Sequence, residues 1–202
     1  MNVARVAEML VEAGALKLGE FRLSSGGVSR VYIDLRILPF KPRLFREAVE
    51  IYSTVAGRVV SEGGIDALAG VATGGIPWAI GLGLLMGMPA TYVRSSAKDH
   101  GTSRLVEAPV RGVKVLVVDD VATTGASIAR AVGVLRSSGA RVEDAIVFID
   151  REHGARELLA SMGVRLHRVT TLREVLASIL ASNLLPRNMV IEALEEMGGS
   201  VG

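Results

Sequence analysis

Cysteine is absent from this chain of 202 residues, which excludes a disulfide framework and thiol chemistry. A chain without cysteine fits a reducing compartment, so we expect a cytoplasmic protein. Glutamine is absent too, and asparagine occurs only at positions 2, 183 and 188. This scarcity of heat-labile side chains indicates a heat-tolerant source. The opening MNVARVAEMLVEAG carries two glutamates within its apolar periodicity, unlike a signal peptide.

A large net charge is also missing. The formal charge is only +2 at pH 7, which is too small to predict a nucleic-acid partner on electrostatic grounds. Residues 67–93 contain no charge at all, and a long apolar run is normally a candidate membrane span. Six glycines and two prolines interrupt this run. We therefore interpret it as a strand, a tight turn, a buried helix and a second strand, and we expect no membrane partner.

Apolar periodicity organises the rest of the chain. It predicts a helix that ends at Gly14, a hairpin over residues 21–36, a helix that opens at Pro42 and a last helix at about 186–197. Between the helix that opens at Pro42 and the one at about 186–197, continuous apolar runs predict strands at about 66–72, 90–94, 113–119, 142–149 and 164–170. Helical patterns alternate with them at about 76–87, 125–138, 153–162 and 172–182.

Continuous apolar strands are buried on both faces, which is typical of a parallel sheet covered by helices. The expected fold class is therefore α/β, with a mostly parallel sheet flanked by helices. We expect three parts: an N-terminal helix, hairpin and following helix (1–63), an α/β core (64–182) and a C-terminal helical tail (183–202). The tail could pack on its own domain or on a partner subunit.

The stretch VLVVDDVATTGAS, residues 115–127, is the first candidate site. In a parallel α/β sheet ligands bind beyond the carboxyl ends of the strands, and here the apolar run meets Asp119 and Asp120. Successive side chains of a strand point in opposite directions, so we expect these carboxylates to have different roles. The next turn offers capping side chains and precedes a helix N-terminus, which favours phosphate. A ribose 5-phosphate would fit both halves, whereas the plainer alternative is an ordinary capped helix.

A second candidate is the polar stretch YVRSSAKDHGTSRLVEAP, residues 92–109. It has no apolar periodicity after Arg94, so we expect a long loop that acts as a lid. Lys98 and His100 in this loop suit a leaving group that develops negative charge, such as pyrophosphate. A solvated loop with incidental charges is the alternative. His153 and His167 have no metal-ligand spacing, and we expect them at the surface.

Several motifs together resemble a known family. Val115–Ser127 resembles the phosphoribosyl-pyrophosphate (PRPP) binding motif of type I phosphoribosyltransferases. Arg-x3-Lys-x-His-Gly, starting at Arg94, resembles the catalytic loop of orotate phosphoribosyltransferases. FRLSSG and SRVYID resemble their hood segment, GVATGGIP (70–77) their pyrophosphate loop, and IDREHGA (149–155) their orotate-binding segment. The resemblance implies the type I phosphoribosyltransferase fold with a small N-terminal hood subdomain.

The resemblance also implies an activity: transfer of ribose 5-phosphate from PRPP to orotate, giving orotidine 5-phosphate and pyrophosphate in de novo pyrimidine (UMP) biosynthesis. It implies Mg²⁺ that bridges ribose hydroxyls and pyrophosphate without direct protein ligands, and a homodimer with shared active sites. The implied catalytic residues are Lys98, His100 and Asp120. The implied PRPP contacts are Arg94, Lys98, His100, Asp119, Asp120, Val121, Ala122, Thr123, Thr124, Gly125, Ala126 and Ser127. The implied orotate contacts are Thr123, Arg151 and Tyr32, although a hairpin aromatic is as often a core residue.

Three positions depart from the family pattern. Ser24, Gly74 and Ser95 stand where many members carry a basic residue. Each charge-assisted phosphate contact contributes about 1.5–3 kcal/mol. Either the affinity for PRPP is lower here, or Mg²⁺ and backbone amides contribute more of it.

Two other functions use the same turn. A non-catalytic PRPP-sensing regulator would need a nucleic-acid-binding element, and Arg5 is the only cation before Lys17. A purine phosphoribosyltransferase would keep the Asp-Asp-Thr-Gly turn, but it has no reason to place Arg151 opposite a carboxylated base. We therefore expect orotate and PRPP as the partners of this chain, and no nucleic acid.

Overall fold

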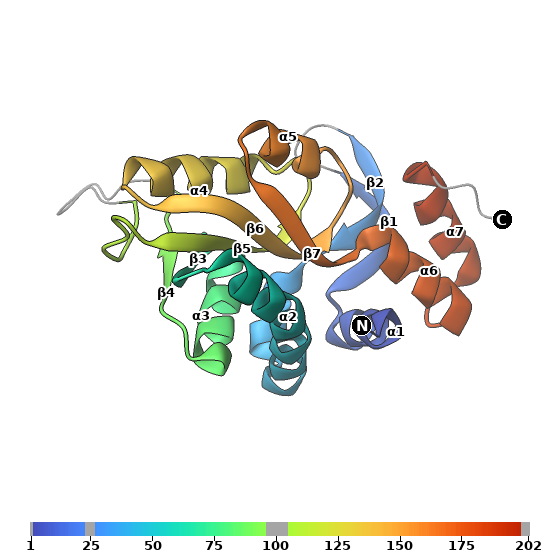
Figure 1. Ribbon diagram of the computed structural model, residues 1–202. Helices are drawn as coiled ribbons and strands as arrows, with labels where there is room; N and C mark the ends of the chain where they lie inside the picture. The colour runs from blue at the N-terminus through green and yellow to red at the C-terminus, as the bar shows by residue number, and fades with distance from the viewer. Residues whose placement is uncertain (1, 23–26, 96–104, 199–202) are drawn as a thin grey trace. The chain divides into compact units, whose positions relative to one another are not determined.

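The computed structural model describes residues 2–22, 27–95 and 105–198 (Figure 1). They belong to two compact units, one made of residues 1–45 and 170–202, the other of residues 46–169. These units divide the chain at different places from the boundaries expected after residues 63 and 182. The helices that follow the last strand in the sequence join the N-terminal unit, because the first of them packs on the N-terminal helix.

The larger unit contains a five-stranded sheet in the order β4-β3-β5-β6-β7, and the pairs β3–β4, β3–β5 and β5–β6 are parallel. Helices α2 and α3 lie on one face of the sheet, and α4 and α5 lie on the other (Figure 1). This is the layered α/β architecture that the continuous apolar strands predict. The strands are β3 (Ala67–Val71), β4 (Ala90–Val93), β5 (Lys114–Ala122), β6 (Arg141–Asp150) and β7 (Arg165–Thr171). The helices are α2 (Pro42–Gly63), α3 (Gly75–Met86), α4 (Ala126–Ser137) and α5 (Ala155–Ser161).

The core of the larger unit lies on both faces of β5. Residues 115–118 are completely buried, as a central parallel strand requires. On the face covered by α2 and α3, Tyr52 and Trp78 pack around Phe148, with ring centroids 5.5 and 4.7 Å from the Phe148 ring. Such aromatic packing adds to the free energy gained from burial. It fixes the two helices beneath the sheet.

The smaller unit combines the N-terminal helix and hairpin with the C-terminal helices. It contains α1 (Val3–Ala13), β1 (Leu16–Arg22), β2 (Val28–Ile33), η1 (Leu35–Phe40), α6 (Leu172–Ser182) and α7 (Arg187–Glu196). Helix α7 packs on α6 and on the antiparallel hairpin, where Glu196 accepts a 2.6 Å hydrogen bond from the Arg30 backbone amide. The tail therefore packs on its own chain. Helix η1 was not foreseen, and the Asp34 carboxylate caps it.

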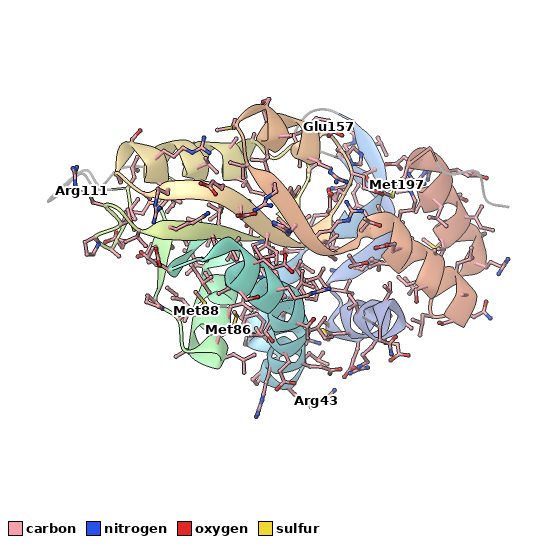
Figure 2. All side chains as sticks on the ribbon, in the orientation of Figure 1. Arg43, Met86, Met88, Arg111, Glu157 and Met197 are labelled. Atoms are coloured by element: carbon pink, nitrogen blue, oxygen red, sulfur yellow. The ribbon has the colours of Figure 1, made fainter. Side chains whose placement is uncertain are left out.

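None of the described helices is both long enough and apolar enough to cross a bilayer. The charge-free run at 67–93 folds into β3, α3 and β4, as predicted. Met86 is the last residue of α3, and Met88 follows its Gly87 cap (Figure 2).

Candidate active site at the carboxyl ends of β5 and β6

The two adjacent carboxylates lie on β5, which continues through them to Ala122 instead of ending at residue 119. Asp119 is buried and Asp120 is half-buried. The Asp119 carboxylate accepts a 3.0 Å hydrogen bond from the Asp120 amide, and the Asp120 carboxylate accepts one of 2.8 Å from Val121. The different burial of the two side chains agrees with the expectation that they do not share one role.

The electrostatic environment of this pair is unfavourable for two negative charges. Burial raises the pKa of Asp119 well above its usual value, and the neighbouring charge of Asp120 raises it further. Beneath them, the buried Tyr52 hydroxyl lies 3.0 Å from the Asp119 carbonyl oxygen and 2.8 Å from that of Ile146. Burial, followed by the two carboxylates, also raises the pKa of Tyr52. A carboxylate with a perturbed pKa at a strand end is a candidate functional group.

A cavity of about 110 Å³ is formed by the end of β5 and the start of α4. It is lined by Asp119, Val121, Ala122, Thr123, Thr124, Gly125, Ala126, Ser127 and Ile128. A site for one water needs roughly 10–15 Å³ on this scale, so the cavity has room for a phosphate group. The structure therefore gathers the predicted residues from Asp119 to Ser127, except Asp120, around one small hollow.

The turn that begins α4 differs from the capped helix start that its threonines suggested. The N-cap is Gly125, which makes no side-chain capping bond. The Thr124 hydroxyl oxygen accepts one long hydrogen bond, 3.5 Å, from the Ala126 amide. Gly125 has φ = 79°, and a Cβ there would lie 3.0 Å from the Ala155 Cα, so the position requires glycine. Apart from this one long contact the start of α4 has no side-chain cap, and the helix dipole there favours an anion.

The loop between β3 and α3 approaches β5 without space for side chains. A Cβ at Gly75 would lie 2.4 Å from the Val118 carbonyl oxygen, and one at Gly74 would lie 2.5 Å from the Asp120 carboxylate. The segment that resembles a pyrophosphate loop thus lies directly against the acidic pair. The departure at Gly74 has a physical consequence, because a lysine there would have to displace the Asp120 side chain.

Arg151 follows β6 and lies next to the turn. Its backbone amide donates a 2.9 Å hydrogen bond to the Ala122 carbonyl, and Ala155 packs against Gly125. The segment predicted to bind orotate and the turn predicted to bind phosphate are therefore neighbours. His153 is exposed, as expected.

Arg94 follows β4 at the start of the predicted lid. Its backbone amide bonds to the Leu105 carbonyl at 2.9 Å, and its side chain forms a 3.1 Å ion pair with Glu107. Arg130 of α4 donates to the Ser95 carbonyl at 2.9 Å, a contact that local sequence spacing did not suggest. Lys98, His100 and Ser24 lie outside the described residues, so their predicted roles stay predictions.

Tyr32 lies on β2 in the smaller unit. Its ring packs on Phe21 with the centroids 5.3 Å apart, and its hydroxyl lies 3.4 Å from an Asp34 carboxylate oxygen. The side chain is partly exposed, which agrees with a contact surface as well as with hairpin packing. Its proposed contact with orotate stays a prediction.

Comparison with known proteins identifies this arrangement. Residues 46–165 match the phosphoribosyl transferase domain family. The chain therefore belongs to the phosphoribosyltransferases, a class of transferase enzymes.

Closer relatives narrow the class. An orotate phosphoribosyltransferase of Sulfolobus acidocaldarius is 45% identical over 179 residues, which is 89% of each chain. The crystal structure of orotate phosphoribosyltransferase from Aeropyrum pernix has a TM-score of 0.77 and 45% identity, covering 86% of this chain and 97% of that one. Within its class, this chain belongs to the orotate phosphoribosyltransferases, and it carries the fold that the sequence predicted.

The purine alternative has weaker support. A crystal structure of adenine phosphoribosyltransferase matches with a TM-score of 0.64 and 20% identity, covering 83% of this chain and 99% of that one. At that identity the match shows a common fold alone. The family assignment thus favours a catalyst that acts on orotate over either rival.

Proposed function

We propose that the chain transfers the phosphoribosyl group from PRPP to orotate at the corner formed by β5, the turn after it and the segment after β6. One observation carries this proposal: the buried carboxylate of Asp119 and the start of α4, whose N-cap makes no side-chain hydrogen bond, border the same hollow. The amides of residues 123–127 would hold the 5-phosphate, and the carboxylates would accept hydrogen bonds from the ribose hydroxyls. Residues 70–75 would lie beside the pyrophosphate.

The two carboxylates would have different roles at the ribose. As the bond from C1 to pyrophosphate breaks, C1 gains cationic character before a ring nitrogen of orotate bonds to it. Asp120 is the less buried acid and faces Gly74, so it is our candidate to stabilise that charge through the ribose. Arg94, Lys98 and His100 would balance the negative charge on the leaving pyrophosphate, and the closed loop would exclude water.

We expect Mg²⁺ to enter the site bound to PRPP. Protein sites hold Mg²⁺ through one or two carboxylates together with substrate phosphates. Among residues 2–22, 27–95 and 105–198, no three acidic, histidine or cysteine side chains gather as a metal site. Asp119 and Asp120 would attract a cation that PRPP carries by their negative charge, through the ribose hydroxyls and not as direct ligands. When bound, the ion would neutralise charge on the pyrophosphate.

Orotate would bind between Arg151 and Thr123. A guanidinium can bind the orotate carboxylate through two parallel hydrogen bonds. The 2.9 Å bond from the Arg151 amide to Ala122 brings that residue beside the turn. Tyr32 of the hairpin would stack on the base.

A homodimer would complete the site. Ile80, Leu84 and Leu85 of α3, here called the α3 strip, are 40%, 82% and 51% exposed. A helix that is apolar around its whole circumference is normally buried, so a second copy of the chain is the cover we propose. We propose a cytoplasmic location for the dimer, supported by the absence of cysteine.

The activity is tested by mixing the protein with PRPP, Mg²⁺ and each base in turn while orotate absorbance is followed. Orotate should be consumed only when PRPP and Mg²⁺ are both present. Consumption of adenine or hypoxanthine with orotate untouched would refute the assignment. PRPP binding without turnover of any base would favour the regulator.

Shared sites are tested with hybrid dimers. Lys98→Ala and Arg151→Ala subunits should each be nearly inactive, and their mixture should regain part of the activity, because one site of the hybrid keeps both residues. Leu84→Arg should shift the protein to monomers in sedimentation and lower its activity. Lack of recovery in the mixture, despite demonstrated subunit exchange, would contradict the shared site.

A further inference from the structure

Asp150 is a buried acid that the proposed reaction does not use. It ends β6 directly before Arg151, and it is 3% exposed. Its carboxylate accepts a 2.8 Å hydrogen bond from the Glu152 amide and forms a 3.5 Å ion pair with Arg168 of β7. A buried carboxylate is costly unless it is paired in this way. Asp150 thereby ties the short turn of residues 150–152 to the neighbouring strand β7.

That turn holds the main chain of Arg151 from three sides. The bond from the Glu152 amide to Asp150 closes an Asx-turn with Arg151 at its centre. The Arg151 amide donates to Ala122, and the His153 ring nitrogen Nδ1 lies 2.5 Å from the Arg151 carbonyl oxygen. Glu152 has φ = 58°, a conformation that is uncommon for residues other than glycine. Such a backbone persists when its surroundings impose it.

We propose that Asp150 is a positioning residue for orotate: with Arg168, it holds the turn in the conformation that presents Arg151 to the orotate carboxylate. The proposal rests on the proposed contact between Arg151 and orotate. Bidentate pairing of a guanidinium with a carboxylate has strict geometry, so small shifts of the turn weaken it. Asp150 acts through Arg151 and does not touch the substrate.

Arg168 has a second, electrostatic effect. Asp150 is an anion buried one residue away from the arginine that is to bind an anionic base. In a poorly hydrated site its negative charge would repel orotate. The Arg168 guanidinium, 3.5 Å from the Asp150 carboxylate, offsets that charge. Loss of Arg168 should therefore weaken orotate binding even though the Asx-turn is intact.

The test measures the KM for orotate and the KM for PRPP separately, together with kcat and the melting temperature. Asp150→Ala should raise the KM for orotate about tenfold, which corresponds to about 1.4 kcal/mol. Its KM for PRPP and its kcat should stay within about twofold of the wild type. Asp150→Asn keeps the oxygen that accepts from Glu152 and should recover much of the loss. Arg168→Gln should raise the KM for orotate by a few-fold.

Asp144→Ala is the matched control. Asp144 is also a buried acid of β6 with an arginine partner on β7, but it lies at the opposite end of the strand. A merely structural role predicts that both alanine variants lower the melting temperature and leave both KM values unchanged. That result, or an equal rise in both KM values for Asp150→Ala, would overturn the proposal.

Arg151→Ala distinguishes a failure of the role assigned to Arg151 from a failure of the positioning role assigned to Asp150. If it leaves the KM for orotate unchanged, the assigned role of Arg151 fails and the positioning role fails with it. If it raises this KM while Asp150→Ala does not, only the positioning role fails. Should Asp150→Ala not fold, Asp150→Ser replaces it, since serine closes such turns more weakly. Its KM for orotate must then exceed that of Asp150→Asn.

Discussion

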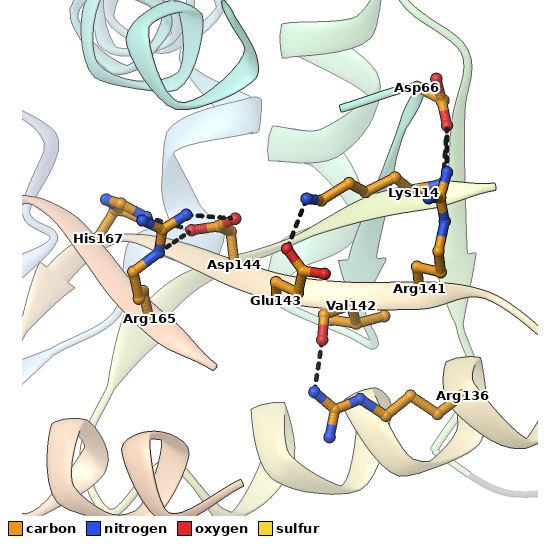
Figure 3. Close-up of polar contacts among 9 residues, drawn as sticks. All are labelled: Asp66, Lys114, Arg136, Arg141, Val142, Glu143, Asp144, Arg165 and His167. Atoms are coloured by element: carbon orange, nitrogen blue, oxygen red, sulfur yellow. Dashed lines mark hydrogen bonds and ion pairs between the residues drawn. The ribbon is translucent and has the colours of Figure 1, made fainter. Parts of the chain in front are cut away.

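Two groups of charged residues in the same sheet, here called the Asp119 cluster and the Asp144 cluster, each contain one buried acid but surround it with opposite charges. Asp119 of β5 is 6% exposed and Asp144 of β6 is not exposed at all. Asp144 accepts hydrogen bonds of 3.0 and 3.2 Å from Arg165 and lies 2.7 Å from a ring nitrogen of His167 (Figure 3). Within the described part of the chain, the carboxylate of Asp119 has no such cation in hydrogen-bond contact, and its charged neighbour is Asp120.

The pKa shifts follow from these partners. Burial alone would raise the pKa of Asp144, but the hydrogen bonds from His167 and Arg165 outweigh it, and the pKa is lowered. For Asp119, burial and the adjacent charge act together and the pKa is raised. The protein thus neutralises the acid at the amino end of β6 by its own side chains. The acid at the carboxyl end of β5 is left for a ligand to neutralise.

Cavity size would have suggested the opposite. A cavity of about 710 Å³ is lined by Arg165, His167 and Glu143 among others, and it is larger than the hollow beside Asp119. Glu143, Arg165 and His167 in its lining already have partners, and the cavity lies at the amino ends of the strands, where parallel sheets do not usually bind ligands. Charge balance and strand polarity therefore identify the functional corner better than volume does.

Removal of the Asp120 carboxylate should have the largest effect. Asp120→Asn keeps the size of the side chain but removes the charge that would stabilise C1, so kcat should fall about 100-fold, or about 2.7 kcal/mol. Steady-state kinetics with saturating PRPP and orotate measures this. Asp144→Asn is the control and should keep kcat within about twofold. Equal losses in the two variants would abolish the distinction between the clusters.

Removal of the Asp144 carboxylate should affect stability instead. Asp144→Ala deletes the acceptor for the Arg165 guanidinium and for a ring nitrogen of His167, and hydrogen bonds to charged groups contribute about 1.5–3 kcal/mol each. Arg165 is 70% exposed, so water replaces part of its contact, and we expect a total loss of about 1–3 kcal/mol. Urea unfolding measures it. A urea midpoint equal to that of the wild type would show that the contacts of Asp144 with Arg165 and His167 do not stabilise the pairing of β6 with β7.

The pH dependence of stability gives the third test, because the pKa of Asp144 is lowered in the folded state whereas that of Asp119 is raised. The lowered pKa of Asp144 means that its contribution is complete above about pH 3.9, the unfolded value, and is lost as the pH falls through the folded pKa. The raised pKa of Asp119 means that the folded state binds its proton more tightly. Stability therefore decreases as the pH rises from about 3.9 through that raised value.

Asp119→Asn should remove the second dependence. Between pH 4.5 and 8 the wild type should lose more stability than Asp119→Asn, and at pH 8 the variant should be the more stable and the less active protein. Urea midpoints at the two pH values give the comparison. Parallel pH profiles would mean that burial of Asp119 carries no electrostatic cost.

The strands and helices were largely predictable because their signal is local. The apolar run at 113–119 predicted β5, but the strand continues to Ala122, since Val121 and Ala122 pair with Ile149 and Asp150 of β6. A charge ends an apolar pattern in the sequence, whereas a strand ends where its backbone partners end. Helix η1 was missed for a related reason, because a short turn stabilised by Asp34 has no periodicity.

The missed contacts of the candidate site join residues that are distant in sequence. Tyr52 reaches Asp119, 67 positions away, and Arg130 reaches Ser95, 35 positions away. His167 was expected at the surface because it has no metal-ligand spacing, but it is half-buried beside Asp144, 23 positions earlier. Local spacing cannot show such pairs. The motif Val115–Ser127 was found because its acids, turn and helix start are consecutive.

The smallest expected effect comes from an ion pair next to Asp144. Lys114 and Glu143 approach to 2.5 Å (Figure 3), and Lys114 lowers the pKa of Glu143. The Glu143 side chain is 55% exposed, however, so water and salt screen the pair. Glu143→Gln should leave the urea midpoint and kcat unchanged within error. If it destabilised the fold as much as Asp144→Ala, burial would not be what separates a structural acid from a surface one, and the comparison with Asp119 would lose its basis.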